Sequence, residues 1–241
     1  MKIVMLNGQN HKGSTYHIGR MIIDKISGEN EITEFFFPKD LNHFCAGCYK
    51  CIEDEAACPF YDEKRKIIDA LDEADVILVT TPTYCMHMSA PLKSFFELTF
   101  DLWMAHRPKE SMFRKKAAVI STAAGTGTNS AMKDVEDCLF YLGIPEIIKY
   151  GVAVQAMNWE GVSPDKKTKI DKKTSLIAKK LEKGKVSVGI KTKFMFGMMK
   201  LMHTKGWNSS PVETQYWKSH GWLDGKKPWI PSRARKINTS N

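Results

Sequence analysis

With 241 residues, of which 43% are hydrophobic and 26% charged, the chain has an ordinary globular composition and can bury one full core plus an extension. No apolar run approaches the roughly 18 residues of a membrane-spanning helix, and six cysteines are too few for a disulfide scaffold. The first residues lack the charged-then-apolar pattern of a signal segment, so we expect a cytoplasmic protein without stable membrane insertion.

The net charge of +9 is unevenly distributed. Residues 1–164 hold 17 Lys and Arg against 22 Asp and Glu, a net charge of −5, whereas residues 165–241 hold 19 against 5, a net charge of +14. Because the basic residues lie in a terminal segment and not across the body, we expect no nucleic-acid partner. The lysine-rich segment 165–183 is predicted to be a helix with a solvated face. Its buried side is expected to contain Ile170, Leu176, Ile177 and Leu181.

Short apolar segments alternate with amphipathic ones along the body. Five strands joined by helical crossovers predict a parallel sheet in three layers, doubly wound, with strand order 2-1-3-4-5. In such an α/β sheet the ligand lies beyond the carboxyl ends of the strands, which selects the loops after strands one, three and four. We expect strands at 2–6, 32–37, 76–80, 117–121 and 147–154, and helices after residue 15 and at 61–73, 89–105, 127–142 and 165–183.

The loop after the first strand, residues 7–15, combines glycine, amide, hydroxyl and lysine side chains. A helix begins inside it, and the free amides and positive dipole end of a helix attract anions such as phosphate. Gly8 and Gly13 would let the backbone approach the ligand, while Ser14 and Thr15 would cap the helix and donate to phosphate oxygens. Neither G-x-G-x-x-G nor G-x-x-x-x-G-K-[ST] occurs here. The alternative is an ordinary strand-to-helix turn.

The other two loops suit a flat polar ring. Pro82 stiffens the loop at 81–93, where Tyr84 and Met86 offer flat or soft surfaces and Ser89 is expected to cap the next helix. The small residues at 122–128 let the backbone approach a planar ligand. One loop for phosphate and two for a ring fit flavin mononucleotide (FMN), and another nucleotide-like ligand would also fit.

These segments resemble the NADPH-dependent FMN reductase group of the flavodoxin-like fold, in particular its iron–sulfur flavoproteins. That group has G-S-P-R-x-x-G-N-T after strand one, where this chain has N-G-Q-N-H-K-G-S-T at 7–15. It also has S-P-x-Y and then L-K after strand three, where this chain has T-P-T-Y at 81–84 and Leu92-Lys93. The resemblance covers about residues 1–155. Gly8 and Asn10 depart from it, since they replace the usual Ser and Arg.

The resemblance implies FMN as cofactor and NADH or NADPH as co-substrate, with electrons passed to a small acceptor such as a quinone, a nitro compound or a flavin. Hydride transfer through a flavin obliges no protein acid or base, so we assign no catalytic residue. Tyr84 and His87 are the candidates for hydrogen bonding near the ring, with a surface or packing role as the alternative for His87. The expected FMN-binding residues are Gly8, Asn10, Lys12, Gly13, Ser14, Thr15, Pro82, Thr83, Tyr84, Cys85, Met86, Thr122, Ala123, Ala124 and Gly125.

A four-cysteine loop has the spacing C-x2-C-x2-C-x6-C, formed by Cys45, Cys48, Cys51 and Cys58. Thiolates in a compact loop can ligate an iron–sulfur centre or zinc. The resemblance implies a 4Fe–4S cluster on these cysteines, in an electron-transfer protein that exchanges electrons with ferredoxin. Acidic residues at 53–55 oppose an anionic thiolate site, so plain thiols remain the alternative.

We expect an FMN-binding domain over 1–186 and a basic, Met- and Trp-rich extension over 187–241. The extension has three interpretations: packing on the body or on a dimer partner, lying on an anionic membrane surface, or stacking on nucleic-acid bases. We favour packing, with the hypothesis that the extension shapes the substrate pocket in a homodimer. A non-catalytic binding module on the same scaffold is the remaining alternative to an enzyme.

Overall fold

The computed structural model describes residues 1–182, 184–207 and 210–231. Its centre is a five-stranded sheet in the order β2-β1-β3-β4-β5, and all neighbouring strands are parallel. This arrangement confirms the predicted doubly wound sheet. The strands are β1 (Lys2–Asn7), β2 (Glu31–Phe36), β3 (Val76–Pro82), β4 (Lys116–Ala123) and β5 (Glu146–Ala153).

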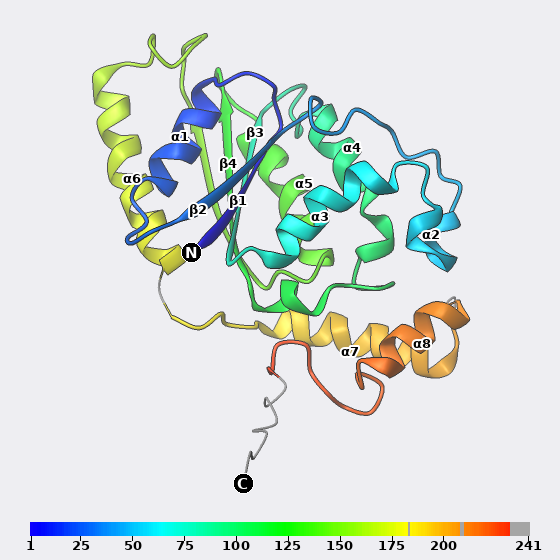
Figure 1. The fold of residues 1–241 in the computed structure, drawn as a ribbon. Helices are drawn as coiled ribbons and strands as arrows, with labels where there is room; N and C mark the ends of the chain where they lie inside the picture. The colour runs from blue at the N-terminus through cyan, green and yellow to red at the C-terminus, as the bar shows by residue number, and fades with distance from the viewer. Residues whose placement is uncertain (183, 208–209, 232–241) are drawn as a thin grey trace, which may run out of the picture.

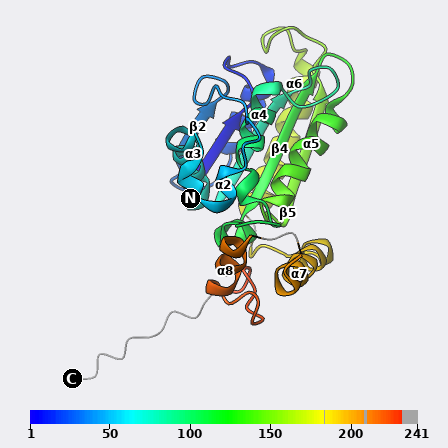
Figure 2. The ribbon, with the colours of Figure 1, turned by 90° about the vertical axis from the view of Figure 1, so that its right-hand side faces the viewer.

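Helices cover both faces of the sheet, which gives three layers (Figures 1 and 2). Alternate side chains of each strand point to opposite faces, so Val4 and Leu6 of β1 join one core cluster and Ile3 and Met5 join the other. The central strands β3 and β4 are buried almost throughout, as expected for a parallel sheet covered on both sides. The first cluster lies under α3 (Tyr61–Glu73), α4 (Ala90–Leu98) and α5 (Thr128–Tyr141), and the second under α1 (Ser14–Ile23) and α6 (Pro164–Glu182).

The helix expected at 89–105 is shorter than predicted. It ends at Leu98, and a 3-10 turn follows at Phe100–Leu102. The last carbonyls of α4 find partners outside the helical pattern, because the Thr99 hydroxyl donates to the Phe96 carbonyl at 2.8 Å and Lys64 Nζ donates to the Leu98 carbonyl at 3.2 Å. These bonds provide partners for two of the carbonyls at the end of the helix, where the chain turns away.

Leu176 on α6 is 56% exposed, so its predicted burial is wrong. The other three residues expected on the inner face, Ile170, Ile177 and Leu181, are buried, and Thr174 completes their stripe. These four positions follow the helical repeat of four and three residues, whereas Leu176 falls out of phase with it. The solvent-exposed face of α6 therefore carries Leu176 as well as the lysines.

The extension packs on the body through an aromatic cluster. It contains α7 (Ile190–Lys205) and α8 (Pro211–Ser219), and its Phe196, Trp217 and Trp222 pack with Met104 and Phe113 of the body. Both helices lie near the amino ends of the strands, far from the loops after β1, β3 and β4 (Figure 1). Within one chain the extension therefore does not cover those loops, and a contribution to them would require a second subunit. Among the helices of the described residues, none has the length and apolarity to cross a membrane.

Candidate functional site

The start of α1 presents free amides at the carboxyl edge of the sheet. The first helical hydrogen bond runs from the His17 amide to the Gly13 carbonyl at 3.1 Å. The amides of Ser14, Thr15 and Tyr16 therefore precede it and have no helical acceptor. The first turn contains no acidic residue, so no carboxylate neutralises the positive end of the helix dipole. This end of α1 is suited to an anion.

The loops after β1, β3 and β4 meet around one cavity of about 240 Å³. Of the residues expected to bind a cofactor, the cavity is lined by Gly13, Ser14, Thr15, Pro82, Thr83, Tyr84, Thr122, Ala123 and Ala124. Sequence reasoning did not anticipate Asn7, Gln9, His11, Tyr16, Thr80, Val154, Ala156 and Met157, which complete the lining. The cavity therefore joins the anion-binding end of α1 to two loops rich in small and hydroxyl side chains.

Hydrogen bonds tie these loops together. The hydroxyls of Thr15 and Thr122 lie 2.5 Å apart and are buried, which links the start of α1 to the end of β4. The Thr83 hydroxyl bonds in turn to that of Ser121 at 2.9 Å. The expectation that Ser14 and Thr15 cap α1 is wrong, because Gly13 holds the cap position and no side-chain cap bond forms. The Thr15 hydroxyl instead joins two walls of the cavity.

Asn7 holds three strands together below the cavity. Its Nδ2 donates to the Phe35 carbonyl at 3.2 Å, and its Oδ1 accepts from the Thr80 hydroxyl at 2.9 Å. Because Asn7 is only 2% exposed, these bonds satisfy an amide that burial would otherwise destabilise. The position of Asn7, a polar amide at the end of an apolar strand, is a feature of the sequence that could have predicted this role.

Gly8 plays a different part from the one expected. Its amide donates to the Thr80 carbonyl at 2.7 Å, and its carbonyl accepts from the Ser89 hydroxyl at 2.6 Å. Both polar groups are therefore engaged within the protein and do not face a ligand. The Ser89 hydroxyl bonds to Gly8 and does not cap α4, although Ser89 occupies the cap position as predicted. Gly8 serves the close packing of β1 against β3 and α4.

Five of the other expected cofactor residues lie outside the cavity lining. The side chains of Asn10 and Lys12 are exposed, and Lys12 Nζ lies 5.2 Å from the centre of the Tyr16 ring. Cys85 and Met86 are exposed as well and have positive φ values of 48° and 72°. The exposed Gly125 also falls outside it. Direct ligand contact from these five positions is not supported by the arrangement of this chain.

The tight turn after β3 is fixed by Asp134 of α5. Tyr84 and His87 pair through both backbone amides, at 3.0 and 2.9 Å. Asp134 Oδ2 lies 3.0 Å from His87 Nδ1 and accepts from the Met88 amide at 3.1 Å. Tyr84 lines the cavity, whereas the His87 ring bonds to α5 and holds the turn. Nothing in the sequence distinguished Asp134 from the other acidic residues of its helix.

The four cysteines lie around a second, largely apolar cavity of about 370 Å³. All four are free thiols, with Cys45 and Cys48 exposed and Cys51 and Cys58 half-buried. Within the described residues, no three His, Cys, Asp or Glu side chains are arranged to hold a metal ion. Burial, aided by the nearby Asp101 carboxylate, raises the pKa of the Cys51 thiol to about 11. As the loop lies here, its thiols do not form a ligand set for 4Fe–4S or zinc.

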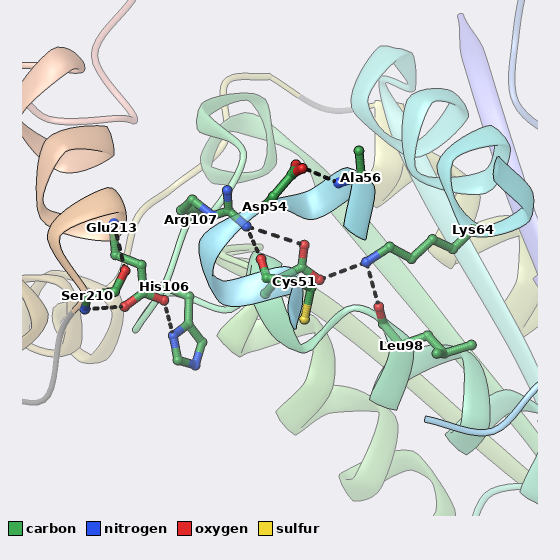
Figure 3. A network of polar contacts seen from close by, with 10 residues as sticks. Cys51, Asp54, Ala56, Lys64, Leu98, His106, Arg107, Ser210 and Glu213 are labelled. Carbon is green, nitrogen blue, oxygen red and sulfur yellow. Dashed lines mark hydrogen bonds and ion pairs between the residues drawn. The ribbon is translucent and has the colours of Figure 1, made fainter. Parts of the chain in front are cut away.

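A buried ion pair supports the cysteine loop from below. Lys64 Nζ lies 3.0 Å from Asp101 Oδ1, and the two side chains are 0% and 1% exposed. Arg107 lies 4.0 Å from the other Asp101 oxygen and donates to the Cys51 carbonyl. Figure 3 shows Lys64, Arg107 and Cys51 converging on this network. Sequence reasoning missed it, because a lysine within a charged helix normally reaches solvent.

The same segment reaches the extension. His106 Nδ1 lies 2.6 Å from the Glu213 carboxylate of α8, and Trp217 Nε1 donates to the His106 carbonyl at 2.6 Å. Glu213 also completes a capping box with Ser210 at the start of α8 (Figure 3). Residues 101–107 therefore connect the cysteine loop to the extension through polar contacts on both sides.

Comparison with known proteins gives sequence relatives for part of the chain. Over 100 residues the chain is 33% identical to an iron–sulfur flavoprotein of Methanocaldococcus jannaschii, covering 40% of this chain and 51% of the relative. An iron–sulfur flavoprotein of Archaeoglobus fulgidus is 26% identical over 98 residues, covering 40% and 48%. The matched part of the chain thus spans about half the length of these curated relatives.

Solved structures share the fold at low identity. An FMN-dependent NADH-azoreductase of Bacillus anthracis, solved with FMN, has a TM-score of 0.58 at 11% identity and covers 76% of this chain and 100% of its own. An NAD(P)H:quinone oxidoreductase of Methanothermobacter marburgensis has a TM-score of 0.56 at 13% identity and covers 78% and 98%. The family model for NADPH-dependent FMN reductases matches residues 1–158, more than half of the chain. The chain therefore belongs to the NADPH-dependent FMN reductase family.

Proposed function

We propose that this protein is an FMN-dependent oxidoreductase that takes hydride from NADH or NADPH and reduces a small acceptor such as a quinone, a nitro compound or a flavin. The observation that carries the proposal is the cavity at the carboxyl edge of the sheet, where the free amides of α1 meet the loops after β3 and β4. Family membership supports the same cofactor. The bound flavin would supply the acceptance and delivery of hydride.

The residues present fit a phosphate at one end of the cavity. The amides of Ser14, Thr15 and Tyr16 provide donors that lack helical acceptors, and the positive end of α1 favours a dianion. The Ser14 hydroxyl also lines this end. Lys12 is exposed outside the lining, so the backbone amides are the proposed phosphate donors.

The other end of the cavity suits a planar ring. Pro82 to Tyr84 form one wall, and Thr122 to Ala124 form the next. The small side chains of the second wall leave its backbone open to a flat ligand. Tyr84 is 47% exposed at this cavity, so its ring is free to contact a ligand.

The chain has to bind and orient, and it does not have to supply a nucleophile or a proton relay for hydride transfer. Of the two candidates near the ring, Tyr84 keeps its proposed role beside the ligand. His87 is assigned a positioning role, because it joins Asp134 and fixes the turn that carries Tyr84.

A flavin titration and a steady-state assay test this proposal. The purified protein should show flavin absorption or bind added FMN at one molecule per chain. It should then oxidise NADPH or NADH in the presence of a quinone. Comparison of the two nicotinamide donors identifies the co-substrate. A colourless protein that binds no added FMN would refute the proposal.

A second candidate function is that of an iron–sulfur flavoprotein. It is favoured by the names of the two curated relatives and by the gathering of Cys45, Cys48, Cys51 and Cys58 around one cavity. A cluster would require the loop to rearrange, because its thiols do not form a ligand set as they lie. Protein purified without oxygen should then contain iron and sulfide and show a broad shoulder near about 400 nm. Such a protein would exchange electrons with a carrier such as ferredoxin.

We further propose that the enzyme works as a homodimer in the cytoplasm. The free thiols suit a reducing compartment. A second subunit would also be needed for the extension to reach the FMN cavity, since within one chain it lies near the opposite edge of the sheet. Light scattering of the holoprotein tests the dimer.

A further inference from the structure

Helix α7 has an apolar stripe on the side that faces away from the body. Its inner side buries Thr192, Phe196 and His203. The stripe consists of Ile190, Phe194, Met198 and Leu201, with exposed fractions of 85%, 68%, 43% and 47%. Spacings of four, four and three residues place these side chains on one helix face, opposite the buried one.

The surroundings of the stripe are cationic. Helix α7 contains Lys191, Lys193, Lys200 and Lys205, and the chain has no Asp or Glu between Glu182 and Glu213. Lys193 and Lys205 are exposed beside the stripe. In the portion of the chain that the structure describes, no carboxylate forms an ion pair with these four lysines. The exposed Trp207 lies just beyond the helix end.

We propose that α7 docks on an anionic lipid bilayer. The apolar stripe enters the interface between headgroups and acyl chains, and the flanking lysines meet the lipid phosphates. Trp207 suits the same interfacial depth, because its ring is apolar and its N–H is polar. The charge distribution favours this contact, since residues 1–164 have a net charge of −5, whereas residues 187–241 hold 10 Lys and Arg against 2 Asp and Glu, a net charge of +8.

A second copy of the chain fits this face less well. Two-fold pairing through the stripe would place the same lysines of both copies against one another. Like charges in such a contact would oppose association. An anionic bilayer satisfies both the apolar stripe and its cationic flanks.

Docking would leave the FMN cavity facing water. The extension and the cavity lie near opposite edges of the sheet (Figure 1). The inference is therefore separate from the proposed function, and either can fail without the other.

Vesicle sedimentation of the full-length protein tests the inference. Vesicles of equal parts phosphatidylcholine and phosphatidylglycerol should carry the protein into the pellet, and pure phosphatidylcholine vesicles should carry much less. The double variant Phe194→Ser with Leu201→Ser should bind the anionic vesicles at least about tenfold more weakly. The matched control is Leu176→Ser, which removes a 56% exposed leucine from α6 and should leave binding unchanged.

A charge variant separates the contribution of the flanking lysines from that of the apolar stripe. Lys193→Glu with Lys205→Glu should abolish the preference for anionic vesicles, and added salt should weaken wild-type binding. Circular dichroism and light scattering accompany every variant. Wild-type protein that stays in the supernatant with both vesicle types would overturn the inference. So would a wild-type dimer that becomes monomeric in the Phe194→Ser, Leu201→Ser variant without any vesicle binding, since the stripe would then join two copies.

Discussion

The hydroxyls of Thr15 and Thr122 lie 2.5 Å apart, although the two residues are 107 positions apart in the chain. Thr15 belongs to the first turn of α1, and Thr122 is the last residue but one of β4. Their bond joins the amides proposed for phosphate to the loop proposed for the flavin ring. The two halves of the cavity are thereby held at a fixed separation before any ligand arrives.

Replacement of Thr15 by valine should destabilise the protein by about 1 kcal/mol, because it leaves the buried Thr122 hydroxyl without its partner. The double variant Thr15→Val with Thr122→Val should recover part of that loss, since neither site then holds an unpaired hydroxyl. Urea unfolding of the FMN-free proteins measures both. Fully additive losses in the double variant would show that the two hydroxyls are not coupled.

Replacement of Gly8 by alanine should destabilise the fold by about 1–3 kcal/mol. A Cβ at this position would lie 2.5 Å from the Ser89 hydroxyl and 3.1 Å from the Thr80 carbonyl. Gly125→Ala is the matched control, because a Cβ there meets no atom within 4 Å. Denaturant unfolding of both variants gives the comparison, and equal midpoints would contradict the packing role of Gly8.

Replacement of Lys64 by methionine should destabilise the protein by about 3–5 kcal/mol, because the Asp101 charge would remain buried without its cation. The surface pair of Arg65 and Asp69, whose side chains are more than half exposed, provides the control. Arg65→Met should change stability by no more than about 0.5 kcal/mol. Thermal and urea unfolding measure the difference, and similar losses in both variants would argue against a structural role for the buried pair.

The pKa of the Cys51 thiol is raised from 9.0 to about 11, so the folded state holds this proton more tightly than the unfolded state. Its contribution to stability is complete below pH 9.0 and is lost as the pH rises toward 11. The free energy of unfolding should therefore fall over this window. In the Cys51→Ala variant the free energy of unfolding should fall less steeply with pH over this window. Urea unfolding at several pH values measures this dependence, and an unchanged pH dependence would exclude Cys51 as its source.

The strand order and the three loops were predictable because they follow from local patterns. Apolar runs such as 76–80 and 117–121 mark strands covered on both faces, and the topology then places their loops at one edge. The sequence did not predict which backbone and side-chain groups of those loops form hydrogen bonds within the protein and which remain open to a ligand. Gly8 has its amide and carbonyl bound by Thr80 and Ser89, two residues that only the fold brings near.

The other differences between prediction and structure involve charged and apolar residues that lie in an unusual environment. Lys64 occurs in a helix rich in charged residues, yet it reaches Asp101 and the Leu98 carbonyl in the interior. Leu176 was expected inside, yet it falls between the buried positions of α6. The spacing of Cys45 to Cys58 brought the four thiols to one cavity, but spacing alone does not determine the direction of each thiol.

The proposed phosphate site consists of the free amides of Ser14, Thr15 and Tyr16 at the start of α1. It is tested most directly by comparing the affinities of the protein for FMN and for riboflavin, which lacks the phosphate. Fluorescence titration of the FMN-free protein should show FMN binding at least about tenfold tighter than riboflavin, because charge-assisted bonds to the phosphate strengthen binding. Ser14→Asp should remove this advantage by placing a negative charge among the amides, while an acid in the first turn favours the helix itself. Equal affinities for FMN and riboflavin in the wild-type protein, or an FMN preference that survives Ser14→Asp, would contradict a phosphate site at α1.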